Sequence, residues 1–182
     1  MNDFIRRQGP AFLAHLLRRI SDELVRGADH WYPQVGVSAA PRTTSTLLAL
    51  DEHGPLGVTE ISALLRQSHP LVISWIKQLK AAGLIDVHAD ETDGRRTVVM
   101  LTRKGAAEVR RLRKALVTMG AASQALMDEA APGVFDALWR MERVCRDKPF
   151  VERLQEHAAG ASTRKPRKRP RKSARDPAVR GS

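Results

Sequence analysis

The chain has 182 residues, a formal net charge of +11 and 42% hydrophobic residues. This length suits one domain of moderate size plus a tail. The longest uncharged, mainly apolar stretch, residues 115–127, is too short to cross a bilayer, and the N-terminus has no signal-peptide core. Cys145 is the only cysteine, which excludes an intrachain disulfide and a cysteine-based metal site. We therefore expect a cytoplasmic protein.

The positive charge is concentrated at the C-terminus. Residues 162–182 carry nine Lys or Arg and one Asp, so they contribute +8 of the net +11 and account for most of the pI of about 10.8. Because this segment has almost no apolar residues, it cannot support a core, and we expect residues 161–182 to form a disordered basic tail. The tail is either a solubilising end or a cationic arm that releases counterions from DNA.

The first predicted element is an amphipathic helix from residue 11 to about residue 31, after the helix-breaking pair Gly9-Pro10. Its apolar residues recur at helical spacing, and its charges lie on the opposite side. A loop rich in Pro, Gly and Ser follows at residues 32–41, and a second helix is predicted over about 42–53.

Residues 59–105 have the order helix, tight turn, helix, β-hairpin, helix. Thr59 is a suitable N-cap for the first short helix, and Arg66-Gln67 turns the chain toward a second helix that Ser68 caps. This is the order of a winged helix-turn-helix, in which the second helix reads DNA.

The second helix of this unit has two distinct faces, and Gly83 ends it. Residues at spacing i, i+3, i+4 and i+7 form an apolar stripe that must be buried: Val72, Trp75, Ile76 and Leu79. Trp75 is therefore expected in the core rather than stacked on a ligand. The opposite, exposed face carries the candidate DNA contacts His69, Pro70, Ile73, Ser74, Lys77 and Gln78, together with the cap Ser68.

Two β-rich runs follow, at residues 84–88 and 97–101. The polar turn between them contains an Asp-Gly pair, which favours a β-hairpin. Two arginines lie at its tip, so the candidate wing residues are Asp93, Arg95 and Arg96. Thr102 is a suitable cap for the long helix that comes next.

These residues resemble the reading helix and wing of MarR-type transcriptional regulators. The matching residues are Ser68-His69-Pro70, Val72, Leu79, Gly83-Leu84, Asp93-Gly94-Arg95-Arg96, Leu101-Thr102 and Gly105. The resemblance is specific over roughly residues 43–110. Two positions depart from the usual pattern, because Ile73 stands where such proteins carry Ser or Thr and Ser62 stands where they carry Ala.

The resemblance implies a mainly α fold, a winged helix-turn-helix with a small β-hairpin wing. We expect a MarR-like domain over 1–160, with its winged core at about 43–105 and dimerisation helices at about 11–31 and 106–158. The second of these is expected to break at Pro132-Gly133 and to kink near Pro149. The flanking helices have apolar faces that the small winged core has no room to cover. A second copy of the chain would bury these faces most simply, so we expect a homodimer.

The expected partner is double-stranded DNA, with the reading helix in the major groove of a pseudo-palindromic operator. Gln78 suits adenine, Ser74 suits either base, and Pro70 and Ile73 suit thymine methyl groups. Arg95, oriented by Asp93, is expected to enter the minor groove. The alternative is that the Asp-Gly pair only forms a favourable turn and that the arginines of the wing are solvated.

The resemblance also implies a small-molecule effector. Its candidate pocket residues are His15, His30, Trp31, Tyr32 and His53, whose alternative roles are in helix caps or the core. Cys145 has apolar neighbours and is expected to be a buried small hydrophobe, the alternative being a redox sensor. No metal site or cofactor is expected.

The sequence has no glycine-rich phosphate loop, nucleophile elbow or paired catalytic carboxylates, so we do not expect an enzyme. Two alternatives to a specific regulator stay open. One is a sequence-tolerant, nucleoid-associated protein that relies on its basic tail. The other is a dimeric interaction module that has lost DNA binding.

Overall fold

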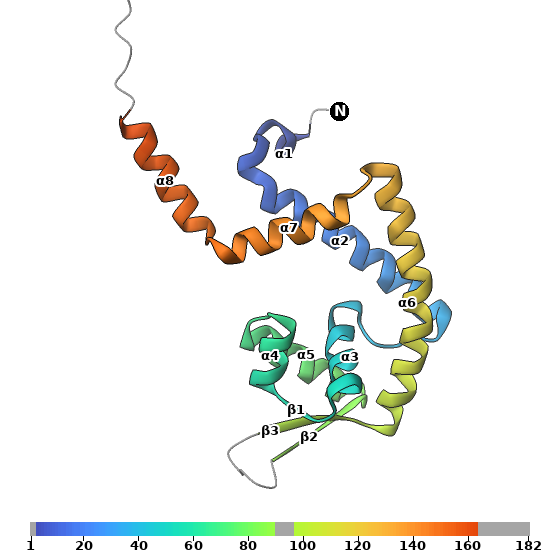
Figure 1. Ribbon diagram of the computed structural model, residues 1–182. Helices are drawn as coiled ribbons and strands as arrows, with labels where there is room; N and C mark the ends of the chain where they lie inside the picture. The colour runs from blue at the N-terminus through green and yellow to red at the C-terminus, as the bar shows by residue number, and fades with distance from the viewer. Residues whose placement is uncertain (1–2, 90–96, 164–182) are drawn as a thin grey trace, which may run out of the picture. The chain divides into compact units, whose positions relative to one another are not determined.

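A computed structural model describes residues 3–89 and 97–163 (Figure 1). The contacts divide the chain into two units, residues 1–124 and 125–182, which are described separately. The helices of the first unit are α1 (Phe4–Arg7), α2 (Leu13–Trp31), α3 (Thr44–His53), α4 (Val58–Leu65), α5 (His69–Ala81) and α6 (Arg103–Ala130), whose end lies in the second unit. Short 3-10 turns occupy Gly9–Phe12, Tyr32–Val35 and Pro41–Thr43.

The three strands form an antiparallel sheet in the order β1-β3-β2, and they are β1 (Leu56–Gly57), β2 (Ile85–Ala89) and β3 (Thr97–Leu101). Val99 of β3 is fully buried and faces Val87 on one side and Leu56 on the other. The prediction of a mainly helical chain with a small hairpin is confirmed. Residues 90–96, between β2 and β3, lie outside the described residues.

The core of the first unit lies between α3, α4, α5, the sheet and the first half of α6. The predicted apolar stripe of α5 is buried, with Val72, Trp75, Ile76 and Leu79 each at most 9% exposed. Leu47, Ile61 and Leu112 bring α3, α4 and α6 into the same cluster. Burial of each large apolar side chain stabilises the fold by about 1.5–3 kcal/mol. The burial of this stripe therefore determines which face of α5 is exposed.

The predicted cap of α4 is wrong by two residues. The helix begins at Val58, and the Gly57 N–H donates a hydrogen bond of 2.6 Å to Glu60 Oε2. Glu60 therefore satisfies the helix start from within the first turn, so Thr59 is an exposed residue of that turn. The predicted cap of α6 is confirmed, because Thr102 Oγ1 accepts a 2.9 Å bond from the Gly105 N–H.

The N-terminal helix is shorter than predicted and is preceded by an additional element. α2 starts at Leu13 because Gly9–Phe12 is a 3-10 turn, and α1 lies before it. Asp3 caps α1 by accepting a bond from the Arg6 N–H, and its other carboxylate oxygen accepts 2.7 Å from Arg19 of α2. Sequence periodicity could not reveal a helix of one turn.

The second unit contains the end of α6, α7 (Val134–Asp147) and α8 (Phe150–Thr163). The predicted interruption near Pro149 is confirmed. Arg153 Nη2 donates 2.9 Å to the Val144 carbonyl, and Lys148 pairs with Glu156 across the same corner. These contacts fix the junction of the two helices.

Helices α7 and α8 expose most of their large apolar side chains. They are Phe135, Leu138, Trp139, Val144, Phe150, Val151 and Leu154. Cys145 is also exposed, so the prediction that it is buried is wrong: its apolar neighbours are on an unpacked face.

α8 continues to Thr163, so residues 161–163 of the predicted tail are helical, and 164–182 lie outside the described residues. Among the helices described, none has the length and apolarity that a membrane crossing requires.

Candidate DNA-binding surface

The outward face of α5 carries the predicted reading residues. His69, Pro70, Ile73, Ser74, Lys77 and Gln78 are all exposed. At 3.6 residues per turn, Pro70, Ser74 and Lys77 fall on the line opposite the buried stripe, while Ile73 lies to one side of it. Ile73 is still 41% exposed, so its side chain is accessible from the same surface.

Ser68 is at the N-cap of α5, as predicted. Its carbonyl accepts bonds of 3.1 Å from the Leu71 and Val72 N–H groups, and its side chain makes no capping bond. Further along, Gln78 Nε2 donates a long, weak bond of 3.4 Å to Ser74 Oγ. Little free energy is therefore needed to turn Gln78 toward another acceptor.

The turn that leads into α5 has an unusual backbone. α4 ends in a Schellman motif, in which the Gln67 N–H donates to the Ser62 carbonyl and the Arg66 N–H donates to the Ala63 carbonyl. Arg66 occupies the left-handed position of this motif, with φ +51°, where glycine is usual. Such a conformation costs a non-glycine residue about 1–3 kcal/mol.

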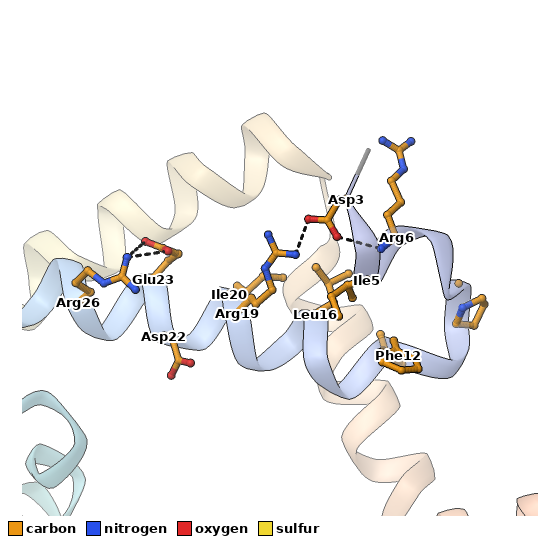
Figure 2. A pocket seen from close by; sticks show the side chains of 13 residues that line it. Asp3, Ile5, Arg6, Phe12, Leu16, Arg19, Ile20, Asp22, Glu23 and Arg26 are labelled. Atoms are coloured by element: carbon orange, nitrogen blue, oxygen red, sulfur yellow. Dashed lines mark hydrogen bonds and ion pairs between the residues drawn. The ribbon is translucent and has the colours of Figure 1, made fainter. Parts of the chain in front are cut away.

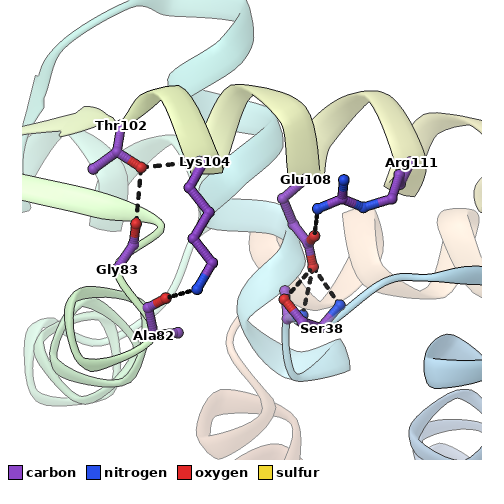
Figure 3. A network of polar contacts seen from close by, with 9 residues as sticks. Ser38, Ala82, Gly83, Thr102, Lys104, Glu108 and Arg111 are labelled. Atoms are coloured by element: carbon purple, nitrogen blue, oxygen red, sulfur yellow. Dashed lines mark hydrogen bonds and ion pairs between the residues drawn. The ribbon is translucent and has the colours of Figure 1, made fainter.

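Hydrogen bonds and close packing join the C-terminal end of α5 to the start of α6 (Figure 3). Thr102 Oγ1 donates 2.8 Å to the Gly83 carbonyl, and Lys104 Nζ donates 2.7 Å to the Ala82 carbonyl. Gly105 lets the backbones approach closely, because a Cβ there would lie 1.9 Å from the Leu84 carbonyl oxygen. Helices α5 and α6 are thus joined through side chains, backbone and close packing.

One turn further along α6, Glu108 anchors the loop between α2 and α3 (Figure 3). Its fully buried carboxylate accepts bonds from the Ser38 N–H and hydroxyl and from the Ala39 N–H, and Arg111 donates 2.6 Å to the other oxygen. Burial alone would raise the pKa of Glu108, but these hydrogen bonds outweigh it, so the pKa lies below its usual value. The carboxylate is charged at neutral pH.

The predicted wing residues Asp93, Arg95 and Arg96 lie outside the described residues. The strands on either side of them are paired from Ile85 with Leu101 to Ala89 with Thr97. The described part of the hairpin therefore leads into residues 90–96 in antiparallel register.

The predicted effector residues do not come together within the described chain. Tyr32 is 2% exposed and belongs to the core, where burial raises the pKa of its hydroxyl. Trp31 is half-buried beside it, and His30 and His53 are exposed. His15 stacks on Phe12 with ring centroids 4.7 Å apart. Because α2 rises about 1.5 Å per residue, His15 and His30 are roughly 22 Å apart along it.

A cavity that the sequence did not indicate lies along α1 and the first half of α2 (Figure 2). Its volume is about 920 Å³, and apolar side chains including Ile5, Phe12, Leu16 and Ile20 line it. Arg19 and Asp3 form an ion pair at its edge. None of the predicted effector residues lines this cavity, and periodicity missed it because it depends on α1.

The winged unit matches known proteins in sequence and in fold. Residues 36–96 match the family model described as the MarR family. A comparison with curated proteins finds no match. The solved structure of BpsR from Bordetella bronchiseptica, a protein whose DNA binding is regulated by 6-hydroxynicotinic acid, is 25% identical with a TM-score of 0.57. That match covers 74% of this chain and 92% of BpsR.

Two structures in complex with DNA are also similar in fold. A mutant MarR of E. coli bound to operator DNA is 17% identical with a TM-score of 0.60, covering 79% of this chain and 99% of that one. The S. aureus MepR–DNA complex is 22% identical with a TM-score of 0.59, covering 74% and 96%. The chain therefore has the winged helix fold of these structures, and its residues 36–96 match the model of the MarR family.

Proposed function

We propose that this protein is a transcriptional regulator that binds operator DNA as a homodimer, with α5 in the major groove. The observation that carries the proposal is the division of α5 into a fully packed apolar face and an exposed face with Ser74, Lys77 and Gln78. These side chains can donate to phosphates or to base edges. Structures of similar fold are complexes with operator DNA or a DNA duplex.

The wing is proposed as a second contact. Asp93, Arg95 and Arg96 fall within or at the end of the residues that match the family model. Arg95 is assigned to the minor groove, where negative potential attracts a guanidinium, and Asp93 and Arg96 are proposed as the other functional residues of the wing. Arg95→Ala is expected to weaken operator binding strongly and to leave the melting temperature unchanged.

Dimerisation is supported by unpartnered apolar surface. α2 exposes Leu13, Leu16, Leu17, Ile20 and Leu24, and α7 and α8 expose the apolar residues named above. A symmetric second copy would bury these faces, and a two-fold dimer presents two copies of α5. The corresponding operator is pseudo-palindromic, with half-sites about one helical turn apart.

Control by a small molecule is part of the proposal. It is supported by the fold similarity to BpsR, whose DNA binding is regulated by 6-hydroxynicotinic acid. An effector would act by favouring a dimer geometry in which the spacing of the two α5 helices no longer fits the operator.

The alternative is a sequence-tolerant, nucleoid-associated protein. The charge distribution favours it, since +8 of the net +11 lies in residues 162–182, and Ile73 replaces a polar residue of the usual reading pattern. In that case the tail would supply most of the affinity, and binding would be strongly salt-dependent without sequence preference.

A competition experiment separates the two functions. DNA fragments selected from the source genome are bound by the full chain and by a version that ends at Thr163, the last residue of α8, at moderate salt, with unrelated DNA as competitor. A specific regulator keeps its selected fragments in both forms. Loss of all selectivity, or loss of binding when the tail is removed, would favour the alternative function.

A further inference from the structure

The chain between α2 and α3, residues 36–43, is a buried and internally bonded part of the first unit, which we call the connecting segment. Val37, Ala39 and Thr43 are each at most 4% exposed. The N–H and the hydroxyl of Thr43 both donate to the Ala40 carbonyl, at 2.9 and 2.7 Å. Because protein interiors are close-packed, a segment of this kind shifts as one body when either of its ends is displaced.

Two side chains from other parts of the first unit hold the connecting segment. Near its start, the Glu108 carboxylate of α6 accepts hydrogen bonds from the N–H groups of Ser38 and Ala39 (Figure 3). Near its end, Arg42 Nη2 donates a bond of 2.6 Å to Asp22 Oδ1 of α2. The connecting segment is therefore bound to α6 at one end and to α2 at the other.

The connecting segment also lies against α5. Its 3-10 turn, Pro41–Thr43, contacts α5 as well as α2 and α3. The C-terminal end of α5 is bonded to Thr102 and Lys104, and Thr102 lies about 9 Å before Glu108 along α6. A displacement of α2 that carries Arg42 with it must therefore move the turn that supports α5, because packed side chains leave little space to absorb the shift.

We propose that Arg42 and Glu108 are positioning residues for DNA binding, because they make the position of α5 follow the position of α2. The inference rests on the proposed function and adds to it the path that joins the dimer helix α2 to the DNA-contacting helix. In a dimer formed through α2, the separation of the two α5 helices is then fixed. Such a dimer accepts one spacing of the half-sites, and each base pair inserted between them adds about 3.4 Å.

The test measures how strictly the full chain selects this spacing. Fluorescence anisotropy compares the genomic fragment that the protein selects with versions that carry one or two extra base pairs between the half-sites. The parent is expected to bind the lengthened versions at least about fivefold more weakly, which is the lower end of usual coupling between two sites. Arg42→Gln is expected to lose most of this discrimination. Arg42→Lys keeps a cation that can pair with Asp22, so it is expected to retain the discrimination.

Asp22→Asn separates positioning from a direct DNA contact. It breaks the same ion pair from the other side, but it makes the chain more positive, which by itself favours DNA binding. If Arg42 acts through α2, Asp22→Asn relaxes the spacing preference as Arg42→Gln does, and the double variant relaxes it no further. The matched control is Arg26→Gln, which breaks an exposed ion pair with Glu23 that lies within α2. It is expected to keep the discrimination of the parent.

Thermal unfolding distinguishes positioning from a general effect on stability. The Arg42–Asp22 pair is exposed, and such pairs contribute little to stability, so Arg42→Gln and Asp22→Asn are expected to keep the melting temperature of the parent. Glu108→Gln lowers the melting temperature, since it disturbs a buried carboxylate. Its binding is therefore measured well below its midpoint, where the spacing preference is expected to be relaxed as well.

Three results for the variants would overturn the inference. The first is unchanged spacing discrimination in Arg42→Gln and Asp22→Asn. The second is an equal loss of affinity for every spacing together with a lower melting temperature, which would make the pair structural. The third is opposite effects of Arg42→Gln and Asp22→Asn on affinity, which would make Arg42 a direct DNA contact.

The parent chain separates failure of the inference from failure of the proposed function. A parent that binds its selected fragment but is indifferent to the spacing overturns the positioning role alone. A parent that binds no DNA overturns both.

Discussion

At the scale of single residues, Glu108 is the most consequential buried group. Its carboxylate holds the backbone of Ser38 and Ala39, which connects the α2–α3 loop to α6. Because the carboxylate accepts four hydrogen bonds in a fully buried site, the charged form is stabilised by folding. Removing it would leave backbone N–H groups without a partner, which is costly in a protein interior.

Glu108→Gln is expected to lower the free energy of unfolding by about 1–3 kcal/mol at pH 7. The folded-state pKa of Glu108 is below its unfolded value, so its contribution is complete above about pH 5 and is lost as the pH falls below about 4.3. Urea denaturation between pH 3 and 7 measures this. An equal loss at every pH would show that the charge of Glu108 does not matter.

Within residues 3–89 and 97–163, two buried hydroxyl groups lack a hydrogen-bond partner, Thr46 Oγ1 and Ser62 Oγ. Ser62→Ala removes an unsatisfied polar atom from a site that is 5% exposed, so it is expected to raise the free energy of unfolding by about 1 kcal/mol. The thermal midpoint measures the change. Ser45→Ala, at a partly exposed position of α3, is the comparison. A lower midpoint for Ser62→Ala alone would mean that the hydroxyl is satisfied in solution.

Sequence reasoning placed the residues of α5 correctly because helical period alone decides which side of an amphipathic helix is buried. It could not place Tyr32, which is 2% exposed and packs within the core cluster of the first unit. Cys145 was misjudged for the opposite reason, since apolar neighbours in sequence do not ensure that a face is covered.

At the scale of elements, the junction of α5 and α6 sets the direction of α5. Thr102, Lys104 and Gly105 all contact the backbone of residues 82–84, where the chain reverses after α5. A change at this junction should therefore alter the orientation of α5 without touching its exposed face.

Gly105→Ala is expected to lower the free energy of unfolding by about 1–3 kcal/mol, because the added Cβ would lie 1.9 Å from a backbone oxygen. DNA binding should weaken as well, since the clash must shift α6 relative to α5. The matched control is Gly120→Ala on the same helix, where the added Cβ meets nothing within 4 Å. That variant should gain about 0.5–1 kcal/mol. Equal melting temperatures for both variants would refute the close approach.

Element order was predictable because caps, glycines and the change from helical to alternating period mark the boundaries of α5, β2, β3 and α6. The one-turn helix α1 was not, since it depends on the tertiary pair of Asp3 with Arg19. The start of α4 was missed because Glu60 replaces the side-chain cap expected at Thr59.

At the scale of the whole molecule, the proposed dimer requires a second copy to cover the exposed apolar faces. Ile20→Glu on α2 is expected to give a folded monomer, because Ile20 is 48% exposed and contributes little to the core of its own chain. His15→Glu, on the opposite side of the same helix, should leave the dimer intact. Sedimentation equilibrium measures both. A parent chain that is monomeric at micromolar concentration would remove the dimer from the model.

The helical period of the sequence could predict that these apolar faces exist, because it shows which side of a helix is apolar. It could not predict which faces pack together, because it carries no information about the partner of a helix. The effector residues were predicted from the family resemblance, and the structure spreads them along α2 and beyond. Only three-dimensional contacts could have shown that Tyr32 is unavailable to a ligand.

The central claim is that the exposed face of α5 reads DNA. The most direct test compares the parent with Lys77→Ala in fluorescence anisotropy, using the genomic fragment that the protein selects and an unrelated duplex. The parent should prefer its fragment by about 10³-fold or more, and Lys77→Ala should bind it more weakly at an unchanged melting temperature. Equal affinity of the two proteins, or equal affinity of the parent for both duplexes, would contradict the account.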